Sequence, residues 1–211
     1  MNLHALQQQL QTGLGQLNLT ASEQQVHQLL DYLQLLFKWN QAYNLTAIRD
    51  PELMVSRHLL DSLALLPYVS DKDLIDVGSG AGLPGIPLAI MKPSLRVDSL
   101  DSNGKKTRFQ FQVKTALGLD NFNIHQHRVE DFQPSNLSQQ LVSRAFASLE
   151  DFVGWTGHLA AADARWLAMK GQFPQQEVDT LPSAFKLEAS YPLEVPGIDE
   201  QRHLLILQRQ A

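Results

Sequence analysis

The stretch DVGSGAGLPGIPLAI, residues 76–90, decides the fold prediction for this chain. An apolar segment at 73–77 leads into three glycines that alternate with small residues, and a proline and an apolar run follow. Glycine adopts backbone angles that are closed to other residues and presents no side chain, so a ligand can approach the main chain closely. The pattern predicts a strand, a glycine turn and a helix, and ligands bind in such crevices at the carboxyl ends of strands.

Two ligand motifs fit this turn. In one register, Gly80, Gly82 and Gly85 match the dinucleotide fingerprint, which is a weak signal by itself. In the other, Asp76 precedes the three alternating glycines, as in the loop that binds S-adenosylmethionine. We favour the second register because Gly78 is the first residue after the strand, so the tight turn begins there. Asp76 also adds a carboxylate, which suits a cofactor with an amino group and a sulfonium. A glycine turn without a ligand is the remaining alternative.

Acidic residues follow the next two predicted strands. Asp101 ends the second strand, about 20 residues beyond the glycine turn, where a carboxylate can accept hydrogen bonds from ribose hydroxyls. It could equally cap the following helix, and both roles are compatible. Val129 and Glu130 follow the third strand, where a turn of the chain could flank an adenine ring or form a solvated loop.

After Ser70, short apolar segments alternate with helical ones. We expect strands near 73–77, 95–100, 122–126, 140–144 and 165–169, and helices near 84–91, 104–117 and 149–161. This order is typical of an α/β fold with a parallel sheet and helices on both faces. Two further strands, at 185–195 and 203–209, have no clear helix between them, so they predict a C-terminal antiparallel hairpin at the sheet edge.

Residues 1–69 predict an N-terminal helical extension. Thr20 with Glu23 fits a capping box, and apolar residues at helical spacing follow it. Asp50 precedes a proline and is suited to begin another helix. No linker separates these helices from the rest of the chain, so we expect the extension to pack on a domain formed by residues 70–211.

Composition excludes several classes of protein. The chain of 211 residues has no cysteine, which excludes disulfides, cysteine nucleophiles and iron–sulfur clusters. The N-terminus does not resemble a signal peptide, and the apolar runs are too short to cross a bilayer. We therefore expect a cytoplasmic protein with no membrane partner. The net charge of −5 shows no overall basic footprint for a nucleic acid, so any such surface must be local.

The sequence resembles the RsmG family, small-subunit ribosomal RNA methyltransferases also called glucose-inhibited division protein B. Besides the glycine stretch, the matching motifs are KWNQAYNLTAI (38–48), RHLLDSL (57–63), LDSNGKK (100–106), SRAFASL (143–149) and RHLLIL (202–207). The resemblance implies a class I methyltransferase fold, with a Rossmann-like sheet behind a helical extension. It also implies S-adenosylmethionine as the methyl donor and N7 of one guanine of 16S rRNA, position 527, as the acceptor.

The resemblance also implies cofactor contacts at particular positions of this chain. These are Gly78, Leu83, Val129, Glu130 and Arg144.

Guanine N7 has a lone pair and no proton, so it can attack without a general base. Alignment of the reactants can then supply up to roughly 7–11 kcal/mol of the barrier reduction. Arginine is the usual partner of guanine N7 and O6, so we expect Arg144 to position the methyl group or the base, with an ion pair as the alternative.

RNA binding requires positive charge, and the candidates form small groups. They are Lys105, Lys106 and Arg108 after the second strand, Arg57 with His58, and Lys170 after the fifth strand. Without the resemblance, we would prefer to interpret the first group as a solvated helix face. Because the chain is acidic, we expect it to bind the 16S rRNA within the small subunit or an assembly intermediate. His125 and His127 have no evident third ligand, so we expect no metal site.

Two other functions remain open from the residues. A nicotinamide-dependent oxidoreductase could use the same glycine turn, although about 40 residues after the fifth strand leave little room for a substrate domain. A non-catalytic module that binds RNA or an adenosine ligand could use the same fold.

Overall fold

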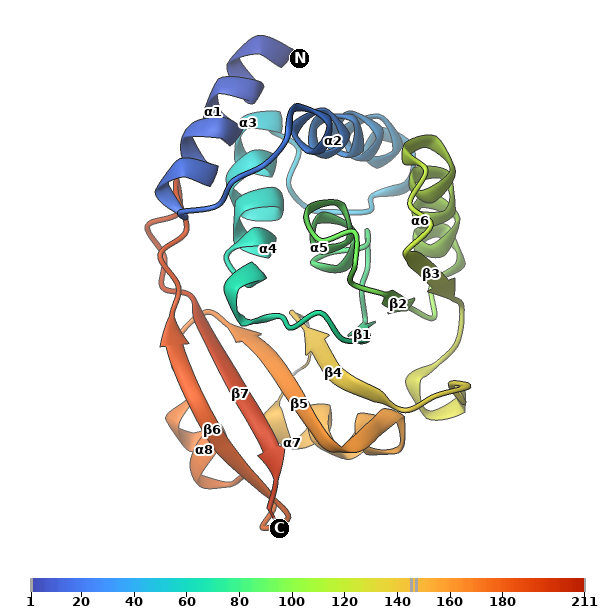
Figure 1. The fold of residues 1–211 in the computed structure, drawn as a ribbon, viewed down its shortest axis with the longest axis vertical. Coiled ribbons are helices and arrows are strands. Elements are labelled where there is room, and N and C mark those ends of the chain that lie inside the picture. Colours follow the sequence, from blue (N-terminus) through green and yellow to red (C-terminus); the bar gives the residue numbers. More distant parts are fainter. Residues whose placement is uncertain (1, 145, 147, 211) are drawn as a thin grey trace.

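The computed structural model describes residues 2–144, 146 and 148–210 and is built around one seven-stranded sheet (Figure 1). Its strands are β1 (Leu74–Val77), β2 (Val97–Leu100), β3 (Phe122–His125), β4 (Ser138–Ser143), β5 (Ala160–Lys170), β6 (Phe185–Pro192) and β7 (His203–Arg209). The order is β3-β2-β1-β4-β5-β7-β6, with β1 to β5 parallel and β7 antiparallel to both of its neighbours. The mostly parallel sheet and its C-terminal hairpin are therefore confirmed.

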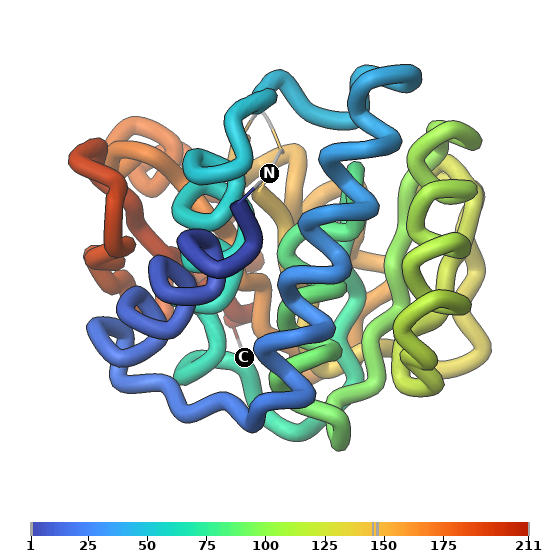
Figure 2. Tube along the Cα trace, turned by 90° about the horizontal axis from the view of Figure 1, so that it is seen from above, coloured from blue at the N-terminus to red at the C-terminus, as the bar shows by residue number. Residues whose placement is uncertain are grey.

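Helices cover both faces of this sheet. They are α1 (Leu3–Gln16), α2 (Glu23–Tyr43), α3 (Pro51–Met54), α4 (Asp61–Leu63), α5 (Gly85–Met91), α6 (Gly104–Leu117), α7 (Leu149–Thr156) and α8 (Gln175–Asp179). A π-helical segment, η1 (Val55–Leu60), joins α3 to α4. On one face, Figure 2 shows α2 between α1 and α6, and Figure 1 shows α5 between α2 and β1. A separate core cluster around Phe152 of α7 and Trp166 of β5 covers the other face.

The helices before β1 share one buried core with the sheet and with α5. Leu10 of α1, Leu33 of α2 and Leu60 of η1 belong to the same buried cluster as Leu74 of β1 and Ile86 of α5. Fully burying a leucine side chain contributes about 1.5–3 kcal/mol, so this shared core holds the extension against the sheet. The division into an extension at 1–69 and a domain at 70–211 stays a prediction.

The ends of two elements differ from the sequence expectation. The capping box of α2 is formed by Ser22 and Gln25 rather than Thr20 and Glu23, because the helix begins at Glu23 and its cap lies two residues after the expected one. The helix expected at 149–161 ends at Thr156, and β5 already begins at Ala160. Parallel pairing of Ala160 with Ser138 draws this segment into the sheet. In the described part of the chain, no helix is long and apolar enough to span a membrane.

Candidate functional site

The glycine turn after β1 has the backbone geometry that its sequence predicts. Gly78, Gly80 and Gly82 have φ values of +69°, +61° and +83°, which side chains rarely tolerate. A Cβ on Gly82 would come within 2.2 Å of Cδ1 of Ile86, so this glycine lets the turn close against α5. A Cβ on Gly78 would meet no protein atom within 4 Å, so Gly78 presents bare backbone to open space.

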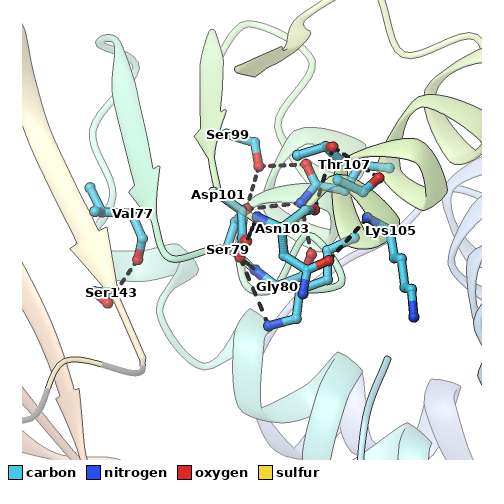
Figure 3. A network of polar contacts seen from close by, with 12 residues as sticks. Val77, Ser79, Gly80, Ser99, Asp101, Asn103, Lys105, Thr107 and Ser143 are labelled. Atoms are coloured by element: carbon cyan, nitrogen blue, oxygen red, sulfur yellow. Dashed lines mark hydrogen bonds and ion pairs between the residues drawn. The ribbon is translucent and has the colours of Figure 1, made fainter. Parts of the chain in front are cut away.

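A polar network beneath the turn fixes its shape (Figure 3). Asp101 accepts hydrogen bonds from the backbone N–H of Gly80 and of Asn103, both at 2.8 Å. The Gln110 amide donates to Gly80 O at 2.8 Å and to Ser79 Oγ at 2.9 Å. The turn is thereby tied to β2 and α6, so its exposed backbone is preorganised for a ligand.

Two cavities meet at this turn. The larger one, about 550 Å³, lies between the glycine turn, the η1 segment and the ends of β4 and β5. The smaller one, about 280 Å³, lies between the ends of β1 and β2, the 127–130 turn and α7. Gly78 lines both cavities. A ligand that spans them would therefore cross bare backbone at this one residue.

Most of the predicted site residues line these cavities. The larger cavity contains Gly78, Gly80, Leu83, Arg57, His58, Lys106, Arg144 and Lys170. The smaller cavity contains Gly78, Asp101, Val129 and Glu130. Lys105 and Arg108 are exposed on α6 and line neither cavity. A third cavity of about 570 Å³, lined mainly by residues 192–203, contains none of the predicted residues.

Asp76 does not meet the ligand-facing role expected of it. Its side chain is fully buried, and Oδ2 accepts a hydrogen bond from the Gly85 N–H at 2.8 Å, at the start of α5. Oδ1 is buried and has no hydrogen-bond partner among the described residues. Burial raises the pKa of Asp76 to about 7, although the Gly85 N–H and the charge of Arg144 oppose the rise. Asp76 therefore stabilises the end of the glycine turn from its buried side.

Asp101 combines features of its two predicted roles. Each carboxylate oxygen accepts a backbone N–H, while the cap of α6 is the neighbouring Asn103. Asp101 is nevertheless in the wall of the smaller cavity, together with Glu130. Carboxylate oxygens have further lone pairs, so both acidic side chains can still accept hydrogen bonds from a ligand there.

Arg144 lies in the wall of the larger cavity and is also ion-paired. Its Nη1 donates to Asp61 Oδ2 at 3.0 Å. Arg202, which precedes β7, donates from Nε to Asp61 Oδ1 at 3.2 Å. The sequence favoured a surface or RNA contact for Arg202 and did not single out Asp61, although both belong to quoted motifs. Positions 145 and 147 of the SRAFASL motif lie outside the described residues.

The other candidate cations differ in how available their charge is. His58 is buried, with Nε2 2.9 Å from Thr46 Oγ1 and Nδ1 3.1 Å from Arg57 O. Burial and, to a lesser degree, the Arg144 charge lower the pKa of His58 to about 4. His58 is thus neutral near pH 7 and adds no positive charge to a phosphate-binding surface, contrary to the expectation.

Arg57, Lys106 and Lys170 are all paired with carboxylates, and the Lys106–Asp101 pair is the longest at 4.0 Å. Arg57 forms an ion pair with the exposed Glu200. Lys170 lies 2.9 Å from Glu177, whose Oε2 also accepts the Leu149 N–H at 2.7 Å at the start of α7. Lys170 therefore joins β5 to the region around α7 as well as lining the cavity.

The described residues contain no group of three or more His, Cys, Asp or Glu side chains placed to hold a metal ion. His125 instead contacts Asp98 Oδ1 through Nε2 at 2.8 Å.

Comparison with known proteins places this geometry in a family. The sequence model of GidB, described as rRNA small subunit methyltransferase G, matches residues 25–205. The chain belongs to the GidB family. It is 55% identical over 204 residues to the ribosomal RNA small subunit methyltransferase G of Pseudomonas syringae pv. syringae (strain B728a), covering 97% of this chain and 95% of the relative. The protein of the same name from Pseudomonas aeruginosa (strain LESB58) is 54% identical, with 96% and 95% covered.

Solved structures show that the chain has the class I methyltransferase fold. TrmN from Thermus thermophilus matches with a TM-score of 0.55 and 16% identity, over 74% of this chain and 53% of its own. The mitomycin 7-O-methyltransferase MmcR matches with a TM-score of 0.61 and 15% identity, over 89% of this chain and 67% of its own. At such low identity, these likenesses concern the fold only.

Proposed function

We propose that this protein transfers a methyl group from S-adenosylmethionine to N7 of one guanine in the 16S rRNA of the small ribosomal subunit. Membership of the GidB family and the names of its relatives support methylation of small-subunit rRNA. The observation that carries the proposal is Gly78, whose bare backbone lies where the two cavities meet.

The smaller cavity fits the adenosine half of the cofactor. Asp101 and Glu130 supply carboxylates for ribose hydroxyls, and Val129, Phe146 and Trp155 supply apolar surface for an adenine ring. The larger cavity fits the remainder, because Gly80 and Leu83 line it with backbone and apolar surface. Together, the two cavities are therefore suited to a nucleoside whose tail is charged but carries no phosphate.

The reaction requires alignment more than proton transfer. When bound, S-adenosylmethionine supplies an electrophilic methyl group on its sulfonium. Guanine N7 already has a lone pair, so the chain need only orient the base and exclude water. Arg144 lies in the cavity wall and can donate a hydrogen bond to guanine O6, which leaves N7 unblocked. The pKa of His58 is lowered to about 4, so its imidazole is a weak base, consistent with a site that does not need a general base.

The RNA would reach the larger cavity over a local basic surface. Lys106, Arg144 and Arg202 line this cavity in a chain whose net charge is −5. Such a small basic area suits an RNA that other molecules also hold in place. We therefore propose a small subunit or an assembly intermediate, in the cytoplasm, as the substrate in preference to protein-free RNA.

Isothermal calorimetry with S-adenosylmethionine and with NAD, followed by radiolabelled methyl transfer to small ribosomal subunits, tests the proposal. We expect binding of S-adenosylmethionine, no binding of NAD, and label at one guanine N7 identified by mass spectrometry. Binding of NAD alone would indicate the oxidoreductase alternative. Binding of S-adenosylmethionine without transfer would indicate the non-catalytic module. Equal activity on protein-free 16S rRNA would contradict the preference for assembled substrate.

A further inference from the structure

Asp61 connects two arginines from distant parts of the chain at the wall of the larger cavity. Its Oδ2 accepts from Arg144 Nη1 at 3.0 Å and its Oδ1 accepts from Arg202 Nε at 3.2 Å. Arg144 follows β4, Arg202 precedes β7, and Asp61 begins α4. All three residues line the cavity that also contains Gly78. One carboxylate from the helical extension thus organises two cationic side chains of the sheet.

The burial of these side chains differs in a way that suggests a role. The Asp61 side chain is 8% exposed, while those of Arg144 and Arg202 are 24% and 21% exposed. The carboxylate is thus behind the arginines, and the guanidinium groups are nearer the solvent. A partly buried ion pair adds little to the stability of a fold, because desolvation of the two charges offsets much of their attraction. Stability alone is therefore a weak explanation for this cluster.

Each arginine keeps donors that the described contacts do not use. Guanidinium groups carry five N–H donors and no acceptor. Among the described residues, Arg144 donates only from Nη1, to Asp61 and to Arg57 O, and Arg202 donates only from Nε and Nη1. The remaining N–H groups can therefore bind oxygen acceptors that enter the cavity.

We propose that Asp61 is a positioning residue for the acceptor nucleotide, acting through Arg144 and Arg202. By holding both guanidinium groups, Asp61 lowers the entropy lost when they bind an oxygen of the RNA, either guanine O6 or a phosphate. This inference rests on the proposed methyltransferase function, and it makes the helical extension a part of the acceptor site.

The test compares Asp61→Asn with Glu188→Gln in small-subunit methylation. Glu188 forms an arginine–carboxylate pair of the same kind, 3.0 Å from Arg165, between β5 and β6. Asparagine keeps the size of Asp61 but offers only one acceptor, so one arginine loses its anchor. We expect Asp61→Asn to lower kcat/KM by about tenfold or more, since each hydrogen bond to a charged group is worth that much. The loss of kcat/KM should exceed any loss of S-adenosylmethionine affinity that follows from the released Arg144, and the activity of Glu188→Gln should not change.

A double-mutant cycle separates positioning from general stability. If Asp61 acts through Arg144, combining Asp61→Asn with Arg144→Lys should reduce kcat/KM by less than the product of the single losses. Independent, multiplying losses would overturn the inference, as would wild-type activity in Asp61→Asn. Equal losses of S-adenosylmethionine affinity and methylation would assign Asp61 a purely structural role and also overturn it.

Other measurements keep the inference testable if Asp61→Asn does not fold. Arg202→Gln leaves the Asp61–Arg144 pair in place and should still reduce methylation without reducing cofactor affinity, so unchanged methylation would contradict the proposal. A 16S substrate with 6-thioguanine at the acceptor, compared with one carrying a methylphosphonate beside it, distinguishes contact at O6 from contact at a phosphate. If the wild-type protein itself did not methylate, the proposed function would fail, and not this inference alone.

Discussion

Asp101 Oδ2 accepts a hydrogen bond from the backbone N–H of Gly80, 21 residues earlier in the chain, at 2.8 Å. The same carboxylate accepts the Asn103 N–H through Oδ1, also at 2.8 Å. One acidic side chain at the end of β2 thus joins the glycine turn after β1 to the start of α6. This group therefore fixes the position of the glycine turn relative to α6.

Replacing Asp101 by asparagine should therefore weaken both the turn and ligand binding. The amide oxygen can accept only one of the two N–H groups, and the amide nitrogen would face the other donor. An unsatisfied buried donor costs about 1–3 kcal/mol. We expect the midpoint of thermal unfolding to fall by several degrees and the Kd for S-adenosylmethionine to rise, both measured by calorimetry. Asp71→Asn, at an exposed pair with Lys92, is the control and should leave the Kd unchanged.

A methyl group on Gly78 should fit without a clash inside the protein, but it should collide with the bound ligand. Gly78→Ala places a Cβ at φ +69° in open space, and Gly118→Ala does the same at φ +65° at the end of α6. The backbone strain is about 1 kcal/mol in each, so both variants should unfold a few degrees earlier. Only Gly78→Ala should lose S-adenosylmethionine affinity, by about tenfold or more. Equal affinities of the two variants would show that no ligand passes Gly78.

Asp76 should make the protein less stable as pH rises toward neutrality. Its pKa is raised to about 7 by burial, so its contribution is fully present below the ordinary carboxyl pKa and is lost as pH rises through about 7. Asp76→Asn removes this titration while its amide oxygen can still accept the Gly85 N–H. The free energy of unfolding of Asp76→Asn minus that of wild type should therefore increase from pH 5 to pH 8 in urea titrations. A difference independent of pH would contradict the shifted pKa.

Lys106 should contribute more to RNA binding than its neighbour Lys105. Lys106 lines the larger cavity with its Nζ 4.0 Å from Asp101 Oδ2, whereas Figure 3 shows Lys105 extending away from the turn. Loss of one phosphate contact reduces the salt dependence of binding by about one unit of slope. We expect that reduction, with weaker small-subunit methylation, in Lys106→Ala but not in Lys105→Ala. Identical salt slopes for the two variants would show that the group acts only as a diffuse charge.

Local sequence patterns determined the order and type of the main elements. The helix at 104–117 was predicted to the residue, and the strands before Gly78 and Asp101 were placed correctly, because alternating apolar runs and glycine or asparagine caps act over a few residues. The glycine turn could be read for the same reason. Where sheet pairing competed with helical spacing, after Thr156, the local reading failed.

Only the tertiary structure decided which charged groups share a site. Asp61, Arg144 and Arg202 are separated by up to 141 residues in sequence, and their contacts form because the start of α4, the end of β4 and the start of β7 lie around one cavity. Likewise, the neutrality of His58 and the burial of Asp76 follow from what surrounds them and not from their neighbours in sequence. Backbone preferences are local, whereas desolvation and ion pairing depend on residues brought together by the fold.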